Sequence, residues 1–375
     1  LRYILDSRTM QGFKLKRSKG GKSMKRLELP HQLADYLCPV NGLCDVYEWK
    51  TGKRIPEELI FYSKVGFQMI SQKNSAVPKM IFLGQGSIGK WEYEFWKGIM
   101  GYEVIAGEGK CFQTTWKNVR ELLDWDIPVI LFGLDMFYLP YQRKFYHKQH
   151  ILGHVVLMTG YDEENVYVHD NSKTEVQIIP IAELELAWAE DYIGISKKNA
   201  YFGINMKFPK TDIARIVQKG IGKNAELYLF SPLSFIGQRG LDRFIEEFPK
   251  WANMFTDEEL QKVYSHFIEY TGSVLPELPY EVSGQQFGIF NPHRASRDKF
   301  SHALMKYADT FGTEVWEEAA GYFQKSGNII EEIVDGFIED VVECSFGQLE
   351  KYIPLFQELR GYEEEAFRKI LYTQN

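Results

Sequence analysis

The pattern of strand-like and helix-like segments changes near residue 209, and this change constrains the fold more than any other feature. Before it, short runs rich in Val and Ile, bounded by Gly, Pro and Asp, alternate with helix-like segments. After it, long amphipathic segments follow one another and strand signals nearly vanish. Because 375 residues exceed one ordinary hydrophobic core, two domains are expected. We predict an α+β domain over 1–208 and a mostly α-helical domain over 209–375.

The pattern also predicts individual elements. In the first part we expect strands at 128–134, 154–161, 165–170 and 175–181, and helices at 39–50, 56–70 and 115–125. In the second part we expect helices at 240–251, 257–270, 296–309, 313–325, 328–342 and 347–372.

Charge and hydropathy narrow the classes of function. The net charge of −7, from 51 acidic and 44 basic residues, gives no support for nucleic-acid binding. No uninterrupted apolar run reaches about 18 residues, so no membrane partner is expected. Four cysteines are too few for disulfides to stabilise a chain of this length, and a reducing cytoplasm is the expected location. The basic stretch Lys14–Arg26 is either a solvated arm or a docking patch for an acidic partner.

The stretch HQLADYLCPVNGLCDVYEW, residues 31–49, holds two cysteines that differ in their setting. Pro39 favours a helix start directly after Cys38, and the free N–H groups at a helix N-terminus favour a thiolate. Cys44 lies two turns further along, on the apolar stripe, and is expected in the core. Their six-residue spacing matches no usual zinc motif, so no metal site is expected. Cys111 and Cys344 are interpreted as structural.

A thiolate nucleophile needs a base, and the base needs an orienting group. His154 opens an apolar strand in GHVVLMTGYDEENVYVHDN, and the chain turns at DEEN. If the hairpin centres on Asp162, residues 154 and 170 face each other directly, which brings the Asp170 carboxylate beside the His154 ring. A register shifted by one residue gives that role to Asn171. The ordinary alternative is a hairpin that ends in a polar turn.

Further residues are candidates for supporting parts. Gln32 lies six residues before Cys38, and its side-chain amide is a candidate oxyanion donor or a plain surface residue. The aromatic segment FYLPYQRKFY, 137–146, is expected either to line a substrate pocket or to pack in the core. From it and its surroundings we name as substrate-binding candidates Tyr138, Tyr141 and His150. Weaker candidates are His31 in the first part and Asn291, His293 and Arg294 in the second.

These blocks together resemble a known family. Four segments resemble the papain-like peptidase domains of bacteriocin exporters: Q-x5-C before a helix, TGKRIPEELI, DIPVILF and GHVVLMTGYDEENVYVHDN. The order Cys, His, Asp along the chain is the papain order. The segment FYLPYQRKFYHKQHILGHVV, with its YLPY and H-x3-GH elements, resembles the butirosin biosynthesis protein H family more closely. The resemblance covers roughly residues 30–205, and the helical remainder resembles the helical domain that often follows. It implies a papain-like domain built on an antiparallel sheet.

The resemblance also implies a chemistry. The butirosin protein moves an acyl chain from the phosphopantetheine thioester of a carrier protein to an amine, which forms an amide. By matching positions, Cys38, His154 and Asp170 would be the catalytic trio. The expected partners are an acyl or peptidyl carrier protein and a small amine acceptor in natural-product biosynthesis, with no cofactor of the enzyme's own. Exporter peptidases carry Gly after the nucleophile, whereas this chain has Pro39, which removes one backbone donor from the oxyanion site.

Two other functions stay open. The same trio can use water, as a cysteine peptidase or thioesterase does. Alternatively, the chain is a scaffold that binds a carrier protein without chemistry. The fate of an acyl adduct on Cys38 separates the three possibilities.

Overall fold

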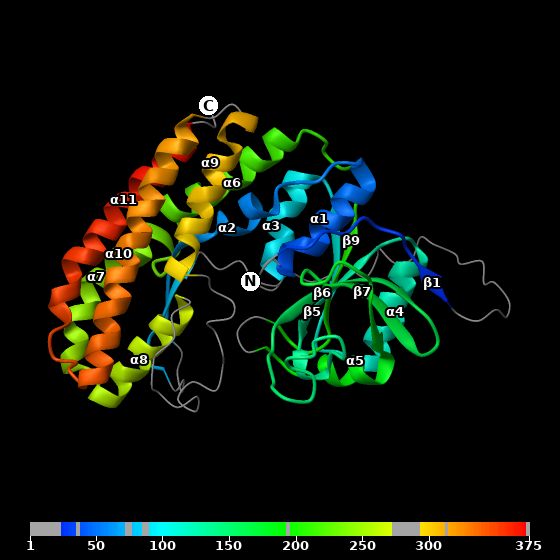
Figure 1. Ribbon diagram of the computed structural model, residues 1–375, viewed down its shortest axis with the longest axis horizontal. Helices are drawn as coiled ribbons and strands as arrows, with labels where there is room; N and C mark the ends of the chain where they lie inside the picture. Colours follow the sequence, from blue (N-terminus) through cyan, green and yellow to red (C-terminus); the bar gives the residue numbers. More distant parts are fainter. Residues whose placement is uncertain are drawn as a thin grey trace.

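The structure is a computed structural model, and it describes residues 24–34, 38–71, 77–84, 90–192, 196–271, 293–311 and 314–372. Its N-terminal part is built on an antiparallel sheet, and the rest is mostly helical, which confirms the expected fold class (Figure 1). Asn291 and most of the basic stretch Lys14–Arg26, along with the side chain of His293, lie outside the described residues.

The main sheet has the strand order β4-β9-β5-β6-β7-β8, and β1 pairs with β6 beyond the end of β5. All its pairings are antiparallel. The strands are β1 (Lys25–Arg26), β4 (Glu103–Gly107), β5 (Val129–Leu134), β6 (His154–Tyr161), β7 (Asn165–His169), β8 (Gln177–Pro180) and β9 (Ala200–Asn205).

Strand β6 is buried along its whole length because helices cover both faces of the sheet. Val155 and Leu157 face one cluster of apolar side chains, which includes helix α1 (Cys38–Thr51). Val156 and Met158 face the opposite cluster, to which α4 (Phe112–Asp124) and α5 (Ile181–Ala187) contribute. This alternation explains why the strand reads as a continuous apolar run in the sequence.

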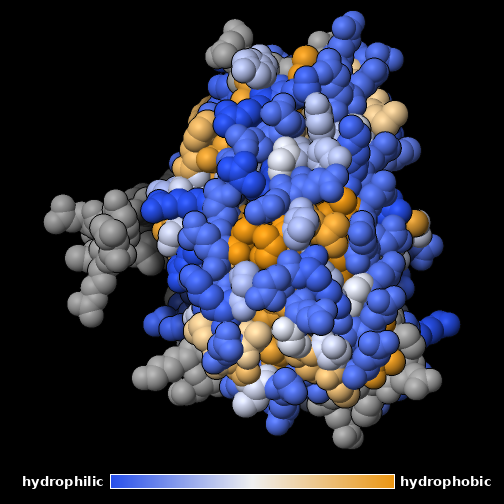
Figure 2. Space-filling model, turned by 90° about the vertical axis from the view of Figure 1, so that its left-hand side faces the viewer, coloured by the Kyte–Doolittle hydropathy of each residue, from blue (hydrophilic) through white to orange (hydrophobic). Residues whose placement is uncertain are grey.

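The helical part follows in the order α6 (Ile213–Leu229), α7 (Gly237–Glu247), α8 (Asp257–Tyr270), α9 (Arg297–Phe311), α10 (Val315–Glu343) and α11 (Ile353–Tyr372). Short 3₁₀ segments lie at η1 (Met136–Tyr138), η2 (Phe248–Asn253), η4 (His293–Ser296) and η5 (Leu349–Tyr352). The segments expected at 313–325 and 328–342 form one continuous helix, since nothing in "QKSGNII" ends it. Figure 2 shows that the helical face is largely hydrophilic, with apolar side chains visible in its middle.

The helix predicted over 56–70 is wrong in its second half. Only α2 (Glu57–Tyr62) is helical, and the chain then forms the hairpin of β2 (Val65–Ile70) and β3 (Met80–Gly84). This hairpin packs against α7 and α8, inside the apolar cluster of the helical part. Tertiary packing decided its conformation, since a short apolar run fits a strand and a helix equally well.

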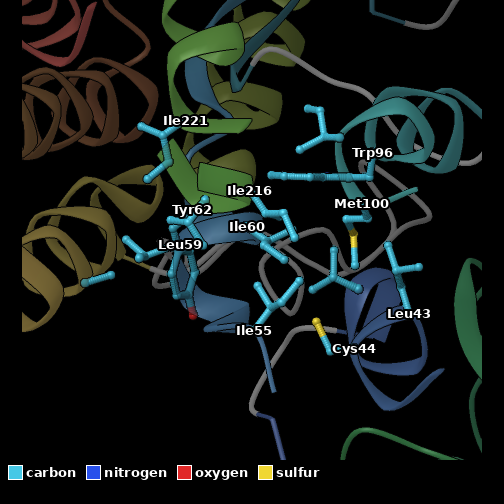
Figure 3. Packing of buried hydrophobic residues seen from close by; sticks show 14 of the residues in the cluster. Leu43, Cys44, Ile55, Leu59, Ile60, Tyr62, Trp96, Met100, Ile216 and Ile221 are labelled. Atoms are coloured by element: carbon cyan, nitrogen blue, oxygen red, sulfur yellow. The ribbon is translucent and has the colours of Figure 1, made fainter. Parts of the chain in front are cut away.

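The two parts also share a core. One apolar cluster joins α1, the sheet and α3 (Lys90–Met100) to α6, α9 and α11. Figure 3 shows this junction with side chains from four helices and a connecting segment, namely Leu43, Cys44, Ile55, Leu59, Ile60, Tyr62, Trp96, Met100, Ile216 and Ile221. The boundary near residue 209 therefore separates a strand-containing part from a helical part, and the two share one apolar core. The division into domains 1–208 and 209–375 stays a prediction.

Arg297 holds the hairpin to the helices from a fully buried position. Its guanidinium pairs with Glu363, with Nη2 and Oε1 2.6 Å apart. It also donates to the backbone carbonyl oxygens of Gly66, at 2.7 Å, and Leu83. One side chain thus pairs with one oxygen of a buried carboxylate and binds two strands of the hairpin.

We expect Arg297→Met to lower the free energy of unfolding by about 3–5 kcal/mol, because it leaves the Glu363 charge buried and unpaired. Denaturant unfolding followed by circular dichroism measures this change. The matched control, Arg368→Met, breaks the exposed pair with Glu364 and should cost about 0–1 kcal/mol. Equal losses in the two variants would contradict the assigned role.

Candidate active site

Cys38 begins helix α1 and is half-buried. Its backbone N–H is among the donors that a helix start leaves without a partner inside the helix. The helix start is held from outside, since the hydroxyl of Tyr93 donates to the carbonyl oxygen of Pro39 at 2.8 Å. Cys44, two turns along, is fully buried, and burial together with the nearby Glu57 charge raises the pKa of its thiol well above the usual value. Of these two thiols, Cys38 is the one suited to act as a nucleophile.

His154 and Asp170 meet in the structure. Nε2 of His154 and Oδ2 of Asp170 lie 2.5 Å apart, and both side chains are buried. The predicted register is wrong, however. Leu157 pairs with His169, so Asp170 continues the ladder opposite Val156, with an irregularity between Met158 and Gly160. The contact survives because residues two apart on a strand share a face, and diagonal neighbours lie within reach of a long side chain.

The Asp170 carboxylate accepts hydrogen bonds at both oxygens. Oδ2 also accepts from the Tyr141 hydroxyl at 2.8 Å and from the Gln142 amide at 3.1 Å. Oδ1 accepts from the backbone N–H of Ser172 at 2.9 Å and from its hydroxyl at 2.7 Å. Burial alone would raise the pKa of Asp170, but the His154 charge and these hydrogen bonds hold it well below the usual range. The group therefore stays ionised.

The second ring nitrogen of His154 is left for the nucleophile. Nδ1 is buried and makes no hydrogen bond of normal length with any residue in the described part of the chain. Burial would lower the pKa of His154, but the Asp170 charge and hydrogen bond, with a smaller contribution from Cys38, raise it to about 10. The Cys38 thiol is thus one of the groups that raise the pKa of the ring. Asp170 holds one ring nitrogen, which is the arrangement in which the other nitrogen of an imidazole can exchange a proton.

The supporting candidates lie in varied places. Tyr141, expected as a pocket wall, donates to Asp170 and so positions the carboxylate. Asn171 lies beside the site, where its side-chain amide donates to the carbonyl oxygen of Ala34 at 2.7 Å. Gln32 is exposed, and its amide is directed to Glu48 at 3.4 Å, so this conformation does not present it as an oxyanion donor.

Tyr138 and His150 lie together on the segment between β5 and β6. The His150 ring stacks on Phe137 with centroids 4.0 Å apart, and its Nδ1 lies 2.6 Å from Asp135. Tyr138 packs edge-on against His150. The His150 side chain is 62% exposed, which leaves a binding role open. In the helical part, Arg294 pairs with Glu331.

A cleft of about 650 Å³ opens between the segment that precedes Cys38 and helix α9. Gln32, Leu33 and Ala34 form one side. Lys299, His302 and Tyr307 belong to the other, so both parts of the molecule line it.

A cluster behind the trio was largely missed from the sequence. His31 and His169 each place Nδ1 near the same oxygen, Oδ2 of Asp45, at 2.7 and 2.9 Å. A useful signal was present in "LCDV", where Asp45 interrupts the apolar stripe of α1. These three groups are of the metal-ligating type, and their ligand atoms lie within 4.8 Å of one another. Around a tetrahedral zinc, ligand atoms are about 3.3 Å apart, so the shorter spacings here are those of direct hydrogen bonds.

Two family models match the chain in different parts. Residues 37–171 match "Butirosin biosynthesis protein H, N-terminal". This part of the chain is similar to the N-terminal domain of the butirosin biosynthesis protein H family. The match encloses Cys38, His154 and Asp170, whereas His31 and Gln32 precede it. With the cysteine at a helix start and the histidine on an antiparallel sheet, residues 37–171 have a papain-like, cysteine-type fold.

The second match, over residues 182–272, is to a domain of unknown function, DUF4872. Among solved structures, a putative C39-like peptidase from Bacillus anthracis is 17% identical, over 50% of this chain and 99% of that chain, with a TM-score of 0.34. A search of curated proteins gives no match. Within the described residues, every helix is too short or too polar to cross a bilayer.

The Asp170 charge sets the protonation of His154, which gives a prediction. We expect Asp170→Asn to lower the pKa of His154 below its value of about 10, because the variant keeps an acceptor but loses the charge. The folded-state pKa lies above the unfolded value of about 6.5, so this stabilisation is complete below pH 6.5 and lost as the pH rises through the folded pKa. In the variant the loss should occur at lower pH, as measured by thermal unfolding between pH 6 and 10.

Asp162→Asn is the matched control for this substitution. Asp162 lies in the turn of the same hairpin, and its carboxylate accepts from the Tyr167 hydroxyl far from His154. An NMR titration of the His154 ring should give the wild-type pKa in this control. An unchanged His154 pKa in Asp170→Asn would contradict the electrostatic account.

Proposed function

We propose that this protein is a cysteine-dependent acyltransferase, which moves an acyl group from a carrier-protein thioester through acyl-Cys38 to an amine. One observation carries the proposal. Nε2 of His154 is hydrogen-bonded to Asp170, while Nδ1 has no hydrogen-bonded partner among the described residues and Cys38 is one of the groups that raise the pKa of the ring. A thiolate–imidazolium pair is the state in which a cysteine attacks a carbonyl carbon.

The first step exchanges one thioester for another. The Cys38 thiolate attacks the donor carbonyl, a bond forms between its sulfur and the acyl carbon, and the donor C–S bond breaks. The His154 imidazolium gives its proton to the leaving thiol. Bond types are conserved, so the step needs no large driving force. The N–H of Cys38 at the helix start stabilises the oxyanion, and one such donor is worth about 3–4 kcal/mol.

The second step forms the amide. An amine attacks acyl-Cys38, neutral His154 accepts the amine proton, and the Cys38 thiolate leaves with restoration of the ion pair. Water competes with the amine at this stage. The helical part lines a cleft together with residues 32–34, near the segment that leads to Cys38 but not lined by the trio itself, and we propose that it helps to exclude water and to admit an acceptor.

The family match favours transfer over the alternatives, since its name describes a biosynthetic protein. A peptidase or thioesterase would use the same trio with water as the acceptor. A non-catalytic scaffold would bind the carrier protein but form no adduct. A phosphopantetheine thioester on a carrier protein is the proposed donor, and a small amine is the proposed acceptor.

Incubation with acyl-carrier thioesters, followed by intact-protein mass spectrometry, tests this function. We expect one acyl adduct, absent in Cys38→Ala, that persists in buffer and is discharged when amines are added. His154→Asn should slow its formation by about 10²–10⁴-fold, as loss of a general acid–base does. Cys111→Ser, which removes an exposed thiol at the N-cap of α4, should behave as wild type.

Two results would contradict the proposal. Discharge by water as fast as by amines indicates a hydrolase. Absence of any adduct with a range of acyl carriers, together with unchanged carrier binding in Cys38→Ala, indicates a scaffold.

A further inference from the structure

We propose that His31 is a positioning residue for the trio: held as an imidazolium between Asp45 and the loop after β7, it fixes the Asp170 carboxylate relative to the helix that carries Cys38. The proposal rests on the proposed site but concerns residues outside its chemistry. His31 touches neither the Cys38 sulfur nor the His154 ring in any described contact, and it acts through the backbone of residue 170.

Both ring nitrogens of His31 face acceptors. Nε2 lies 2.8 Å from the carbonyl oxygen of Lys173 and 3.1 Å from that of Asp170. A carbonyl oxygen only accepts, so Nε2 carries a proton. Nδ1 lies 2.7 Å from Oδ2 of Asp45. If that carboxylate is ionised, Nδ1 carries a proton as well, and the ring is positively charged.

The surroundings keep Asp45 ionised. Its other oxygen, Oδ1, lies 2.9 Å from the Arg54 guanidinium. Burial alone would raise the pKa of Asp45, but hydrogen bonds from His169 and His31, and the charges of His31 and Arg54, lower it. For His31, burial lowers the pKa, but the Asp45 bond and charge and the two backbone carbonyls raise it overall. The acceptors around the ring and this shift both favour the protonated imidazole.

The geometry links this charge to the catalytic loop. His169 and Asp170 are adjacent, so their side chains point to opposite faces of the sheet. The His169 ring lies on the side of α1, where it bonds Asp45 and packs on His31 with ring centroids 4.3 Å apart. The Asp170 side chain lies on the other side, against His154. The end of β7 thus carries two hydrogen-bond networks, one through Asp170 to His154 and one through His169 to Asp45. His31 belongs to the second network and also contacts the backbone carbonyl of Asp170.

The same network holds the segment that leads to the nucleophile. Arg54 bridges Asp45 to Glu48 at 2.8 Å and also pairs with Glu57. Asn41, in the first turn of α1, donates to the carbonyl oxygen of Gln32 at 3.0 Å and to Glu57. The groups that face His31 itself are Asp45 from α1, His169 from β7, and the backbone carbonyls of Asp170 and Lys173. Together they tie residues 31–34, α1 and the Asp170 loop to one buried charge.

The test measures alkylation of Cys38 by chloroacetamide between pH 5 and 10, in the Cys111→Ser/Cys344→Ser background, by intact mass. The alkylation rate depends on the thiolate–imidazolium pair whether or not the protein transfers acyl groups. A failure of the positioning proposal can therefore be told apart from a failure of the proposed acyl transfer. We expect His31→Asn to lower the rate constant at pH 6–7 by about tenfold or more, because a displaced Asp170 stabilises the His154 imidazolium less. His31→Gln, whose longer side chain can bring an amide N–H to the two carbonyls that Nε2 binds, should recover part of the loss.

Controls separate positioning from general destabilisation. His147→Asn, at an exposed histidine far from Asp45, should alkylate at the wild-type rate. NMR of wild-type protein at pH 7.5 should show protons on both ring nitrogens of His31. In His31→Asn the NMR titration of His154 should give a lower pKa than in wild type.

Three results would overturn the proposal. One is a neutral His31 ring at pH 7.5 with an ordinary titration near pH 6.5. Another is a His31→Asn protein that is thermally less stable yet keeps the wild-type pH profile of alkylation, which indicates a merely structural role. The third is one zinc ion per chain in the purified protein, whose removal by a chelator slows Cys38 alkylation as much as His31→Asn does.

Discussion

The close approach of helix α1 to strand β6 is the constraint on which the rest of the structure depends. Gly42 faces Leu157, and a Cβ at position 42 would lie only 2.8 Å from the Cβ of Leu157. Cys38 lies one turn before this contact on the helix, and His154 lies three residues before it on the strand. Because both elements are rigid and packed through the same point, their contact fixes how the thiol and the imidazole stand relative to each other.

Two groups of buried charged side chains lie near this contact, one on each side of the sheet. On one side of the sheet, the Asp170 carboxylate accepts from several donors and stabilises the His154 imidazolium. On the other side, Asp45 lies among His31, His169 and Arg54. Buried charges are costly unless paired and hydrogen-bonded, and both carboxylates meet that condition. The site is thereby held by directional bonds as well as by apolar packing.

The helical part is integral to this arrangement. Its helices share an apolar cluster with α1 and with the sheet, and they enclose a hairpin that comes from the first hundred residues. Arg297 bonds that hairpin from α9, while the shared cleft lies between α9 and the segment before Cys38. Movement of α9 would therefore alter the cleft beside residues 32–34.

The sequence by itself determined the fold class, the cysteine at the helix start and the pairing of His154 with Asp170. These follow from local rules, namely a proline at the first helical turn, an apolar run buried on both faces, and the two-residue period of strands. The resemblance to the butirosin protein H family could also be read from its motifs. The exact register could not, because the irregularity between Met158 and Gly160 shifts the pairing without a sequence signal that specifies its position.

Only the tertiary structure decided the remaining parts of the site. Tyr141 reaches Asp170, the Gln32 amide reaches Glu48, and His31 meets Asp45 and His169 through contacts between distant segments. The apolar run at 65–70 became a strand because a place beside α7 and α8 was available to it. Local patterns state which face of an element is buried, but the partner on that face depends on the packing of the whole chain.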